Sequence, residues 1–327
     1  MFDLTNEIYT DSGKAREHLE AIQWPDGAIC PHCGNSDRTR ITKLEGKSTR
    51  PGVYKCKECR KPFSVTVGTV FERSKIPLNK WVLAAHLYAA SKKGMSAHQL
   101  HRMLGVTYKT AWFMAHRIRE AMKEDNNTSG PIGGDGKTVE ADEMYHGKRE
   151  TPRQYARGRK PNPTKSGKAG GAQKRVIVGL VERGGPVRTF HVNNATKASV
   201  REALVRNVSR DTTLYTDESR LYTDTGKEYA GHRTVKHTAK EYARRAGDVV
   251  VHTNTIENVF SIFKRGMTGV YQHCGEAHLH RYLAEFDFRH NRRSALKVSD
   301  RERAEDAVRM AAGKSLMYSQ SSARSYA

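Results

Sequence analysis

Hydrophobic residues in the N-terminal part of the chain recur at intervals of three and four positions, a spacing that predicts amphipathic helices. One helix is expected within 1–24, and another begins at Pro77, a residue suited to the start of a helix. Two more follow Ser96 and Thr107, whose side chains are typical of helix N-caps. The turn at 105–106 contains glycine, which is typical of a helix-turn-helix but also fits a plain helical hairpin.

Beyond residue 137 the pattern changes to short apolar runs between turn-forming residues, which predicts strands alternating with helices. This order suits a mixed α/β sheet in which the strand ending at Asp217 lies beside the strand carrying Asp142. The expected strands are 61–68, 138–145, 175–181, 187–192, 213–217 and one near 234–237, and the expected helices are 199–208, 219–222, one opening within 252–265, and 278–293.

The helix expected within 252–265 carries two stripes. Its apolar residues form a buried face, whereas Glu257, Ser261 and Lys264 share a second face because seven residues make almost two turns. The carboxylate and the cation then stand roughly 10 Å apart, at about 1.5 Å of rise per residue. A capping role is the simpler alternative for Glu257, because it follows Asn254 by three residues and would then satisfy backbone N–H groups.

The net charge of the chain indicates what kind of partner it binds. Lysine and arginine number 57 against 35 aspartates and glutamates, for a net charge of +22 spread along the chain. This excess favours a polyanion such as nucleic acid over a basic protein of another function. Because no apolar run approaches the roughly 20 residues of a membrane span and no secretion signal is evident, we expect a cytoplasmic, nucleoid-associated protein.

Two close pairs of cysteines predict a metal site. Cys30 with Cys33 and Cys56 with Cys59 can place four thiolates tetrahedrally around one zinc ion. Two disulfides are the alternative, which the absence of a secretion signal disfavours. Because all four ligands come from the protein, we expect a structural zinc that replaces the missing core of a small module. Cys274 is expected to be an ordinary structural thiol.

Three acids from separate predicted elements, Asp142, Asp217 and Glu257, suit a second kind of metal site. Carboxylate oxygens are the ligands that Mg²⁺ (or Mn²⁺) prefers, and two such ions support phosphodiester chemistry. The sequence contains no phosphate-binding glycine loop with its lysine and no serine elbow that offers a competing centre. Two nearby acids, Glu140 and Glu143, could contribute to this site, but the expected role of each is a solvated charge at a strand edge.

Basic residues on one of the predicted helices are candidates for DNA binding. The second helix of the helix-turn-helix pattern is expected to point Lys109 and Arg117 outward, together with Tyr108, His116 and Arg119.

Several segments together resemble a known family. They are the two cysteine pairs and the stretches 139–143, 214–217, 252–266 and 281–293. In this order they resemble a bacterial insertion-sequence transposase of family 1595, whose members carry an N-terminal zinc ribbon and a DDE-type catalytic domain. The likeness covers most of residues 20–295.

The resemblance implies an RNase H-like fold for about residues 136–295, with Asp142 on the first strand, Asp217 on the fourth and the third catalytic residue on the helix after the sheet. Some family members have asparagine at this third position, and Asn258 is adjacent to Glu257. The spacing to Lys264 and the affinity of a carboxylate for Mg²⁺ favour Glu257.

The implied reaction is metal-dependent cleavage of double-stranded DNA at the element's terminal inverted repeats, followed by strand transfer into target DNA. Two Mg²⁺ ions are expected, Lys264 and its neighbour Arg265 would hold DNA, and a homodimer or larger assembly would join the two ends. A DNA-binding regulator and a stand-alone metal-dependent nuclease are the alternatives.

The predicted domains follow these assignments. They are 1–72 (N-terminal helix and zinc ribbon), 73–124 (helix-turn-helix-like region), 125–137 (linker), 138–295 (RNase H-like domain with a basic insertion at 148–174) and 296–327 (C-terminal tail).

Overall fold

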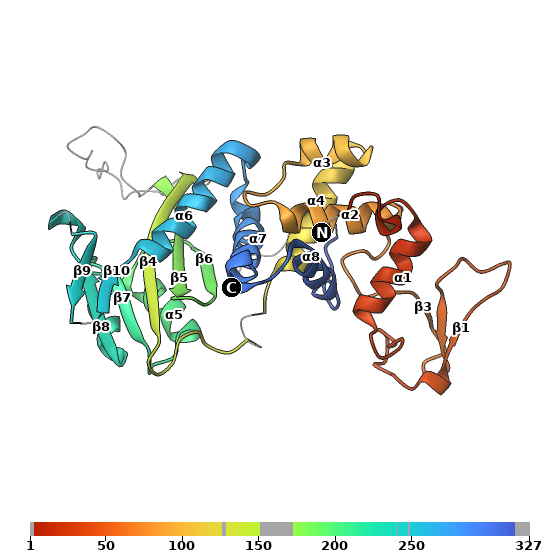
Figure 1. The fold of residues 1–327 in the computed structure, drawn as a ribbon, viewed down its shortest axis with the longest axis horizontal. Helices are drawn as coiled ribbons and strands as arrows, with labels where there is room; N and C mark the ends of the chain where they lie inside the picture. Colours follow the sequence, from red (N-terminus) through yellow and green to blue (C-terminus); the bar gives the residue numbers. More distant parts are fainter. Residues whose placement is uncertain (1–2, 126–128, 151–172, 240, 248, 318–327) are drawn as a thin grey trace, which may run out of the picture. The chain divides into compact units, whose positions relative to one another are not determined.

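The computed structural model describes residues 3–125, 129–150, 173–239, 241–247 and 249–317. The chain divides into two units, one made of Met1–Lys123 with Arg292–Ala327 and the other of Glu124–Asn291 (Figure 1). Most of the basic insertion predicted at 148–174 lies outside the described residues, as does the end of the C-terminal tail. Within the described ranges, no helix combines the length and apolar character needed to cross a bilayer.

The first unit contains a small antiparallel sheet. Strands β1 (Ile41–Lys43), β2 (Tyr54–Cys56) and β3 (Pro62–Phe63) pair in the order β1-β2-β3. β3 is much shorter than the strand predicted at 61–68, because the chain enters turns after Phe63. The apolar cluster under the sheet is small and includes two of the cysteines together with Phe63.

The rest of the first unit is helical. Ser96 accepts a hydrogen bond from the Gln99 backbone N–H (3.1 Å), and Gly105 ends the helix in the left-handed conformation (φ 58°), as the turn pattern predicts. The C-terminal helix α8 was not predicted, and it packs against α2. The helices are α1 (Ser12–Gln23), α2 (Leu78–Ala90), α3 (Ala97–Leu104), α4 (Tyr108–Met122) and α8 (Asp300–Arg309), with short 3-10 helices at Glu7–Tyr9, Arg38–Arg40 and Ser294–Leu296.

The second unit is built on a five-stranded mixed sheet with the order β6-β5-β4-β7-β8. β4 pairs antiparallel with β5 and parallel with β7, while β5–β6 is antiparallel and β7–β8 is parallel. This is the RNase H-like arrangement, and it confirms that the strand ending at Asp217 lies beside the strand carrying Asp142. The strands are β4 (Thr138–Lys148), β5 (Lys174–Glu182), β6 (Val187–Val192), β7 (Thr213–Asp217) and β8 (Gly231–Val235).

Helices cover both faces of this sheet. α5 (Lys197–Asn207) packs in one hydrophobic cluster with Val139, while α6 (Asn254–Gly266) and α7 (Leu279–Asn291) pack in another with Met144. Val139 and Met144 point to opposite faces because side chains alternate along β4.

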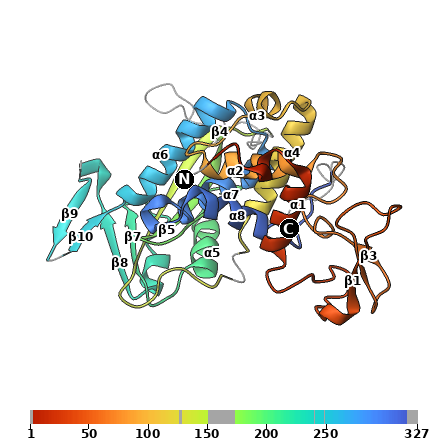
Figure 2. The ribbon, with the colours of Figure 1, turned by 45° about the vertical axis from the view of Figure 1, so that its right-hand side comes forward.

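Other features of the second unit differ from the expectations. A two-stranded hairpin, β9 (Ala243–Ala246) and β10 (Val249–His252), lies beside β8 (Figures 1 and 2). The helix predicted at 219–222 is a turn. Ile132, within the predicted linker, is buried in the α5 cluster. The remaining helical turns are Thr225–Glu228, His237–Ala239 and Glu276–His278, and a π-helical turn at Met267–Tyr271.

Candidate active site and zinc site

The pairing of β4 with β7 brings the two aspartates together. Val139 is level with Leu214, and Glu140 is level with Tyr215. Continuing this register by two residues places Asp142 beside Asp217 on the same face of the sheet. Each carboxylate also accepts a backbone N–H: Asp142 from Glu143 (2.8 Å) and Asp217 from Ser219 (2.9 Å). The sheet therefore fixes both side chains.

Helix α6 carries Glu257 to the same face. The helix lies close to the sheet because Gly179, directly opposite Asp142 in the β4–β5 ladder, has no side chain. A Cβ there would lie 2.7 Å from Ile256 and from the ring of Phe260. A glycine thus allows the helix to approach the strand beside Asp142.

The start of α6 contradicts the capping interpretation of Glu257. The N-cap is Thr253, one residue earlier than predicted, and its side chain caps no backbone N–H. The N–H groups of Thr255 and Ile256 instead donate to the carboxylate of Glu140, at 2.8 and 3.1 Å. Glu140 is fully buried, so its prediction as a solvated charge was wrong. The Glu257 side chain is 43% exposed, and it accepts from the Thr253 hydroxyl (3.1 Å) and lies 3.4 Å from His237 Nε2.

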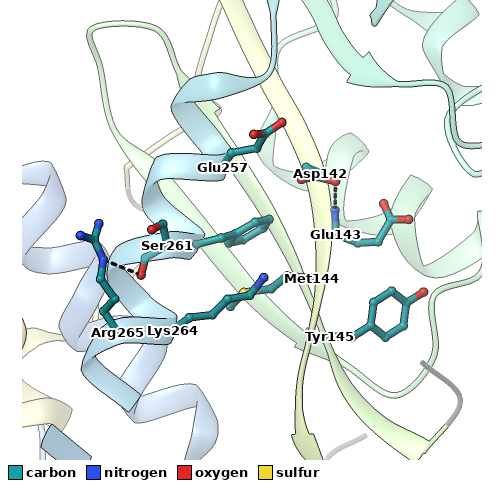
Figure 3. Close-up of a pocket in the computed structure, with 9 residues that line it drawn as sticks. Asp142, Glu143, Met144, Tyr145, Glu257, Ser261, Lys264 and Arg265 are labelled. Atoms are coloured by element: carbon teal, nitrogen blue, oxygen red, sulfur yellow. Dashed lines mark hydrogen bonds between the residues drawn. The ribbon is translucent and has the colours of Figure 1, made fainter. Parts of the chain in front are cut away.

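A cavity of about 600 Å³ opens between β4 and α6. Figure 3 shows Glu257 and Lys264 reaching from the helix toward the strand that carries Asp142. Ser261 also lines the cavity, so the second stripe predicted for this helix is confirmed. The lining residues are Asp142, Glu143, Met144, Tyr145, Glu257, Phe260, Ser261, Lys264 and Arg265.

Glu143 and Tyr145 also line the cavity. The sequence interpretation gives Glu143 only as an acid that could contribute and does not assign Tyr145 to the site. Both lie on the far side of β4 from α6 (Figure 3). Glu143 accepts a hydrogen bond from the buried Tyr222 hydroxyl (2.8 Å), so it is not the solvated charge predicted. Tyr145 is 38% exposed. Their closeness to Asp142 along one strand was the available signal.

The acids strongly influence one another. Burial, and after it the negative charges of Glu143, Asp217 and Glu257, together raise the pKa of Asp142 to about 8. Burial likewise raises the pKa of Glu143, although the Tyr222 hydroxyl opposes the shift. A carboxylate among carboxylates is stabilised in its charged form by a nearby cation.

The donor set fits a hard divalent cation. Asp142, Asp217 and Glu257 offer only oxygen ligands, which suit Mg²⁺ or Mn²⁺. Asp142 and Glu257 line the cavity, whereas Asp217 does not. The three acids also do not close around one point, since only the four cysteines gather that tightly among the described residues. Asn258 is exposed and does not line the cavity, so the geometry favours Glu257.

The four cysteines fit a zinc ion. Their Sγ atoms all lie within 4.8 Å of one another, and no disulfide joins them. Cys30 and Cys59 are 3.6 Å apart and Cys33 and Cys56 are 3.7 Å apart, close to the roughly 3.8 Å expected for thiolates tetrahedrally bound at about 2.3 Å. Backbone N–H groups of Cys59 and Glu58 help to lower the pKa of Cys56 to about 6, which favours the thiolate.

Cys274 is a buried thiol apart from the four-cysteine cluster and forms no disulfide, in agreement with the prediction. Its Sγ donates to the carbonyl of Gly275 (3.2 Å).

The orientation predicted for Arg117 was wrong. Arg117 is buried and donates to the carbonyls of Glu72 (2.9 Å) and Leu316 (3.2 Å). His116 and Arg119 are buried as well, because α2, α3 and α8 pack around α4. The outward residues are at the start of α4: Lys109 is exposed, and Tyr108 stacks on His98 with ring centroids 4.3 Å apart.

Lys264 and Arg265 are exposed in the last turn of α6. Both line the cavity, and the Arg265 guanidinium donates to the Ser261 carbonyl (3.3 Å).

Comparisons with known proteins agree with this architecture. Residues 133–291 match the model of the ISXO2-like transposase domain, and residues 10–62 match that of the transposase zinc-ribbon domain. A protein described as "Uncharacterized protein in transposable element ISH50", from Halobacterium salinarum, is 28% identical over 288 residues, which is 86% of this chain and 92% of the relative. That relative is archaeal, so it gives no support for the bacterial origin expected from the sequence.

Two solved structures are also similar to this chain. A Mos1 strand transfer complex covers 66% of this chain and 70% of its own, with 10% identity and a TM-score of 0.27. A pre-cleavage Mos1 transpososome covers the same shares, with 9% identity and a TM-score of 0.25. These scores are too low to support an argument, whereas the two family models match the two modules expected from the sequence. The chain belongs to the ISXO2-like transposases of insertion-sequence family 1595, with an N-terminal zinc ribbon and a DDE transposase domain.

Proposed function

We propose that this protein binds the terminal inverted repeats of its insertion sequence and catalyses metal-dependent cleavage and strand transfer of DNA. One observation carries the proposal. The β4–β7 register sets Asp217 beside Asp142, and the close packing of α6 brings Glu257 and Lys264 to the cavity that Asp142 lines.

The three acids would hold two Mg²⁺ or Mn²⁺ ions. Bound there, the ions would activate the attacking oxygen and stabilise the leaving oxygen of a phosphodiester. In cleavage, water attacks phosphorus and the P–O bond to the 3′ oxygen breaks, which releases a 3′-hydroxyl. In transfer, that hydroxyl attacks a target phosphodiester and displaces its 3′ oxygen.

The basic residues at the cavity would position the substrate. The Lys264 ammonium is suited to a backbone phosphate near the reacting one, and Arg265 continues the positive surface along α6. Tyr145, exposed on the other side of β4, offers a ring on which a base can stack.

Recognition of the DNA ends would fall to the first unit. No acid occurs between Glu72 and Glu120, a stretch that includes α2, α3 and most of α4. Within it, Lys109 and Arg102 are exposed near the turn between α3 and α4. This acid-free surface and the zinc ribbon favour contact with DNA phosphates. Two ends must be joined, so a homodimer or larger assembly is expected.

The test uses purified full-length protein, labelled DNA carrying the element's inverted repeats, and buffers with and without Mg²⁺. We expect end cleavage only with the metal, and its loss in Glu257→Gln but not in Asn258→Ala. The opposite result for these two variants would move the third ligand to Asn258. Binding of the ends without any cleavage by the wild-type protein would instead support a DNA-binding regulator, and cleavage without strand transfer would support a nuclease.

A further inference from the structure

Glu140 forms a buried junction between β4 and the start of α6. Its carboxylate accepts hydrogen bonds from the backbone N–H groups of Thr255 (2.8 Å) and Ile256 (3.1 Å) and from the Thr255 hydroxyl (2.9 Å). The side chain is fully buried. An acid from another segment therefore satisfies the first N–H groups of α6 and lies at the positive end of the helix dipole.

Arg183 balances the charge of Glu140 and extends the junction. Its Nε donates to the Glu140 carboxylate (2.8 Å), and its two terminal nitrogens donate to the carbonyls of Val250 and His252, both at 2.9 Å. The guanidinium also lies 4.5 Å from the ring centroid of Tyr215. One ion pair thus ties together β4, the end of β10 and the residues that lead into α6.

The junction lies next to two of the proposed metal ligands. Glu140 precedes Asp142 by two residues, so both point to the same face of β4. Ile256, whose N–H it accepts, directly precedes Glu257. The carboxylate therefore fixes the backbone of the strand and of the helix within two residues of each ligand.

We infer that Glu140 is a positioning residue that sets the separation of Asp142 and Glu257 and thereby the affinity of the active site for divalent metal. This inference rests on the proposed function. Groups that hold metal ligands in place through hydrogen bonds typically change metal affinity or activity by about 10- to 100-fold when they are lost.

The matched control is Glu182, an acid on β5 of the same sheet. It accepts a backbone N–H from Gly133 (2.9 Å) and pairs with Lys137 (2.9 Å), and its side chain is 12% exposed. It has the same kinds of contact as Glu140, but its partners lie outside α6.

The experiment titrates full-length Glu140→Gln, Glu182→Gln and wild type with Mn²⁺ by calorimetry, at a temperature where circular dichroism shows all three folded. We expect about 10- to 100-fold weaker Mn²⁺ binding for Glu140→Gln and no change for Glu182→Gln. Cleavage of end DNA by Glu140→Gln should recover part of its rate at high Mn²⁺, while its affinity for the DNA ends stays at the wild-type value.

Thr255→Val provides a milder variant, because it removes one hydrogen bond to Glu140 and retains the charge. Its Mn²⁺ affinity should lie between those of wild type and Glu140→Gln. Wild-type Mn²⁺ affinity in folded Glu140→Gln, or an equal loss in Glu182→Gln, would overturn the inference. If Asp142→Asn leaves Mn²⁺ binding as it is in wild type, the proposed function itself fails, which separates the two results.

Discussion

The zinc ribbon and the acidic site both gather side chains that suit a metal, but the fold supports them very differently. In the ribbon, four thiol groups lie within 4.8 Å of one another, and of these only Cys56 is on the small sheet, whose strands have two or three residues. In the DDE domain, Asp142 and Asp217 lie on a five-stranded sheet with a hydrophobic cluster on each face, and Glu257 lies on helix α6, which packs against that sheet.

The contrast shows whether the metal ion organises the fold or the fold organises the metal site. A module with so small a core depends on its ion for folding, because binding free energy becomes folding free energy. In the acidic site the order is reversed. The packed sheet and helix bring the acids together, and burial first, then the neighbouring negative charges, raise the pKa of Asp142 and so oppose its ionisation. Metal should therefore be required for structure in the first unit and for chemistry in the second.

The largest effect expected is from zinc removal. Chelation, or Cys56→Ser, should unfold the ribbon, since structural zinc in such peptides contributes about 10 kcal/mol or more of apparent binding free energy. Hydrogen exchange should rise over 26–63 and stay low in the DDE domain, and binding to the DNA ends should weaken. Cys274→Ser is the control, because this buried thiol lies outside the cluster. If the metal-free ribbon kept its protection from hydrogen exchange, its fold would not depend on zinc, and the contrast between the two sites would fail.

A second test removes charge from the acidic site. Asp142→Asn and Asp217→Asn should each lower the cleavage rate on the order of a thousandfold, since metal stabilisation of transition-state charge is worth several kcal/mol. The metal-free variants should be as stable as wild type, or more so, because repulsion falls. Thermal unfolding measures this, and Asp224→Asn, an exposed acid paired with Lys197, is the control. Marked unfolding of both site variants would argue against a site that the fold assembles without metal.

A third test disturbs the packing that brings α6 to the sheet. Gly179→Ala should cost about 1–3 kcal/mol through overpacking against Ile256 and Phe260, and it should slow cleavage by displacing Glu257. Zinc affinity should not change. Gly269→Ala is the control, because a Cβ there meets nothing within 4 Å. Denaturant unfolding and a zinc competition assay provide the two measurements, and wild-type cleavage by a destabilised Gly179→Ala would separate packing from catalysis.

The last test sharpens the comparison through pH. Burial raises the pKa of Asp287 to about 8 from an ordinary value of 3.8, so the folded domain keeps a proton that the unfolded chain loses. The stability that this proton provides is present at low pH and is lost as pH rises through about 8. The ribbon should respond oppositely, because zinc binds deprotonated thiols.

Asp287→Asn should flatten this decline of the DDE domain between pH 5 and about 8, as denaturant unfolding at several pH values would reveal. Asp211→Asn changes an exposed acid and should leave the slope unaltered. An identical slope in Asp287→Asn and wild type would show that Asp287 is ionised throughout, held by its hydrogen bonds from Thr189.

Local patterns determined much of what could be predicted. Cysteine spacing pointed to the ribbon, and apolar runs located β6 and β7 at their observed bounds. The adjacency of Asp142 and Asp217 followed from the order of strands and helices. These features depend on residues close in sequence or on rules of chain connection.

The features that the sequence did not predict depend on packing between segments far apart in the chain. Arg117 lies on a helix face that looks polar, but carbonyls at Glu72 and Leu316 satisfy its donors. Glu140 sits in a strand of mixed character, and its burial follows from Arg183 and the start of α6, both far along the chain. No periodicity reveals such partners. The hairpin β9–β10 was missed because its exposed strands have no apolar face that alternates along their length.

The parallel pairing of β4 with β7 has a consequence for how this protein can misfold. A slip of β7 by one residue would keep most backbone hydrogen bonds, yet it would turn Asp217 toward α5 and away from Asp142. Such a misaligned sheet would retain its spectroscopic signature while losing catalysis altogether. The nicking activity recovered after refolding would therefore measure the fraction of molecules in which β7 has the correct register. Circular dichroism does not distinguish these molecules from misaligned ones.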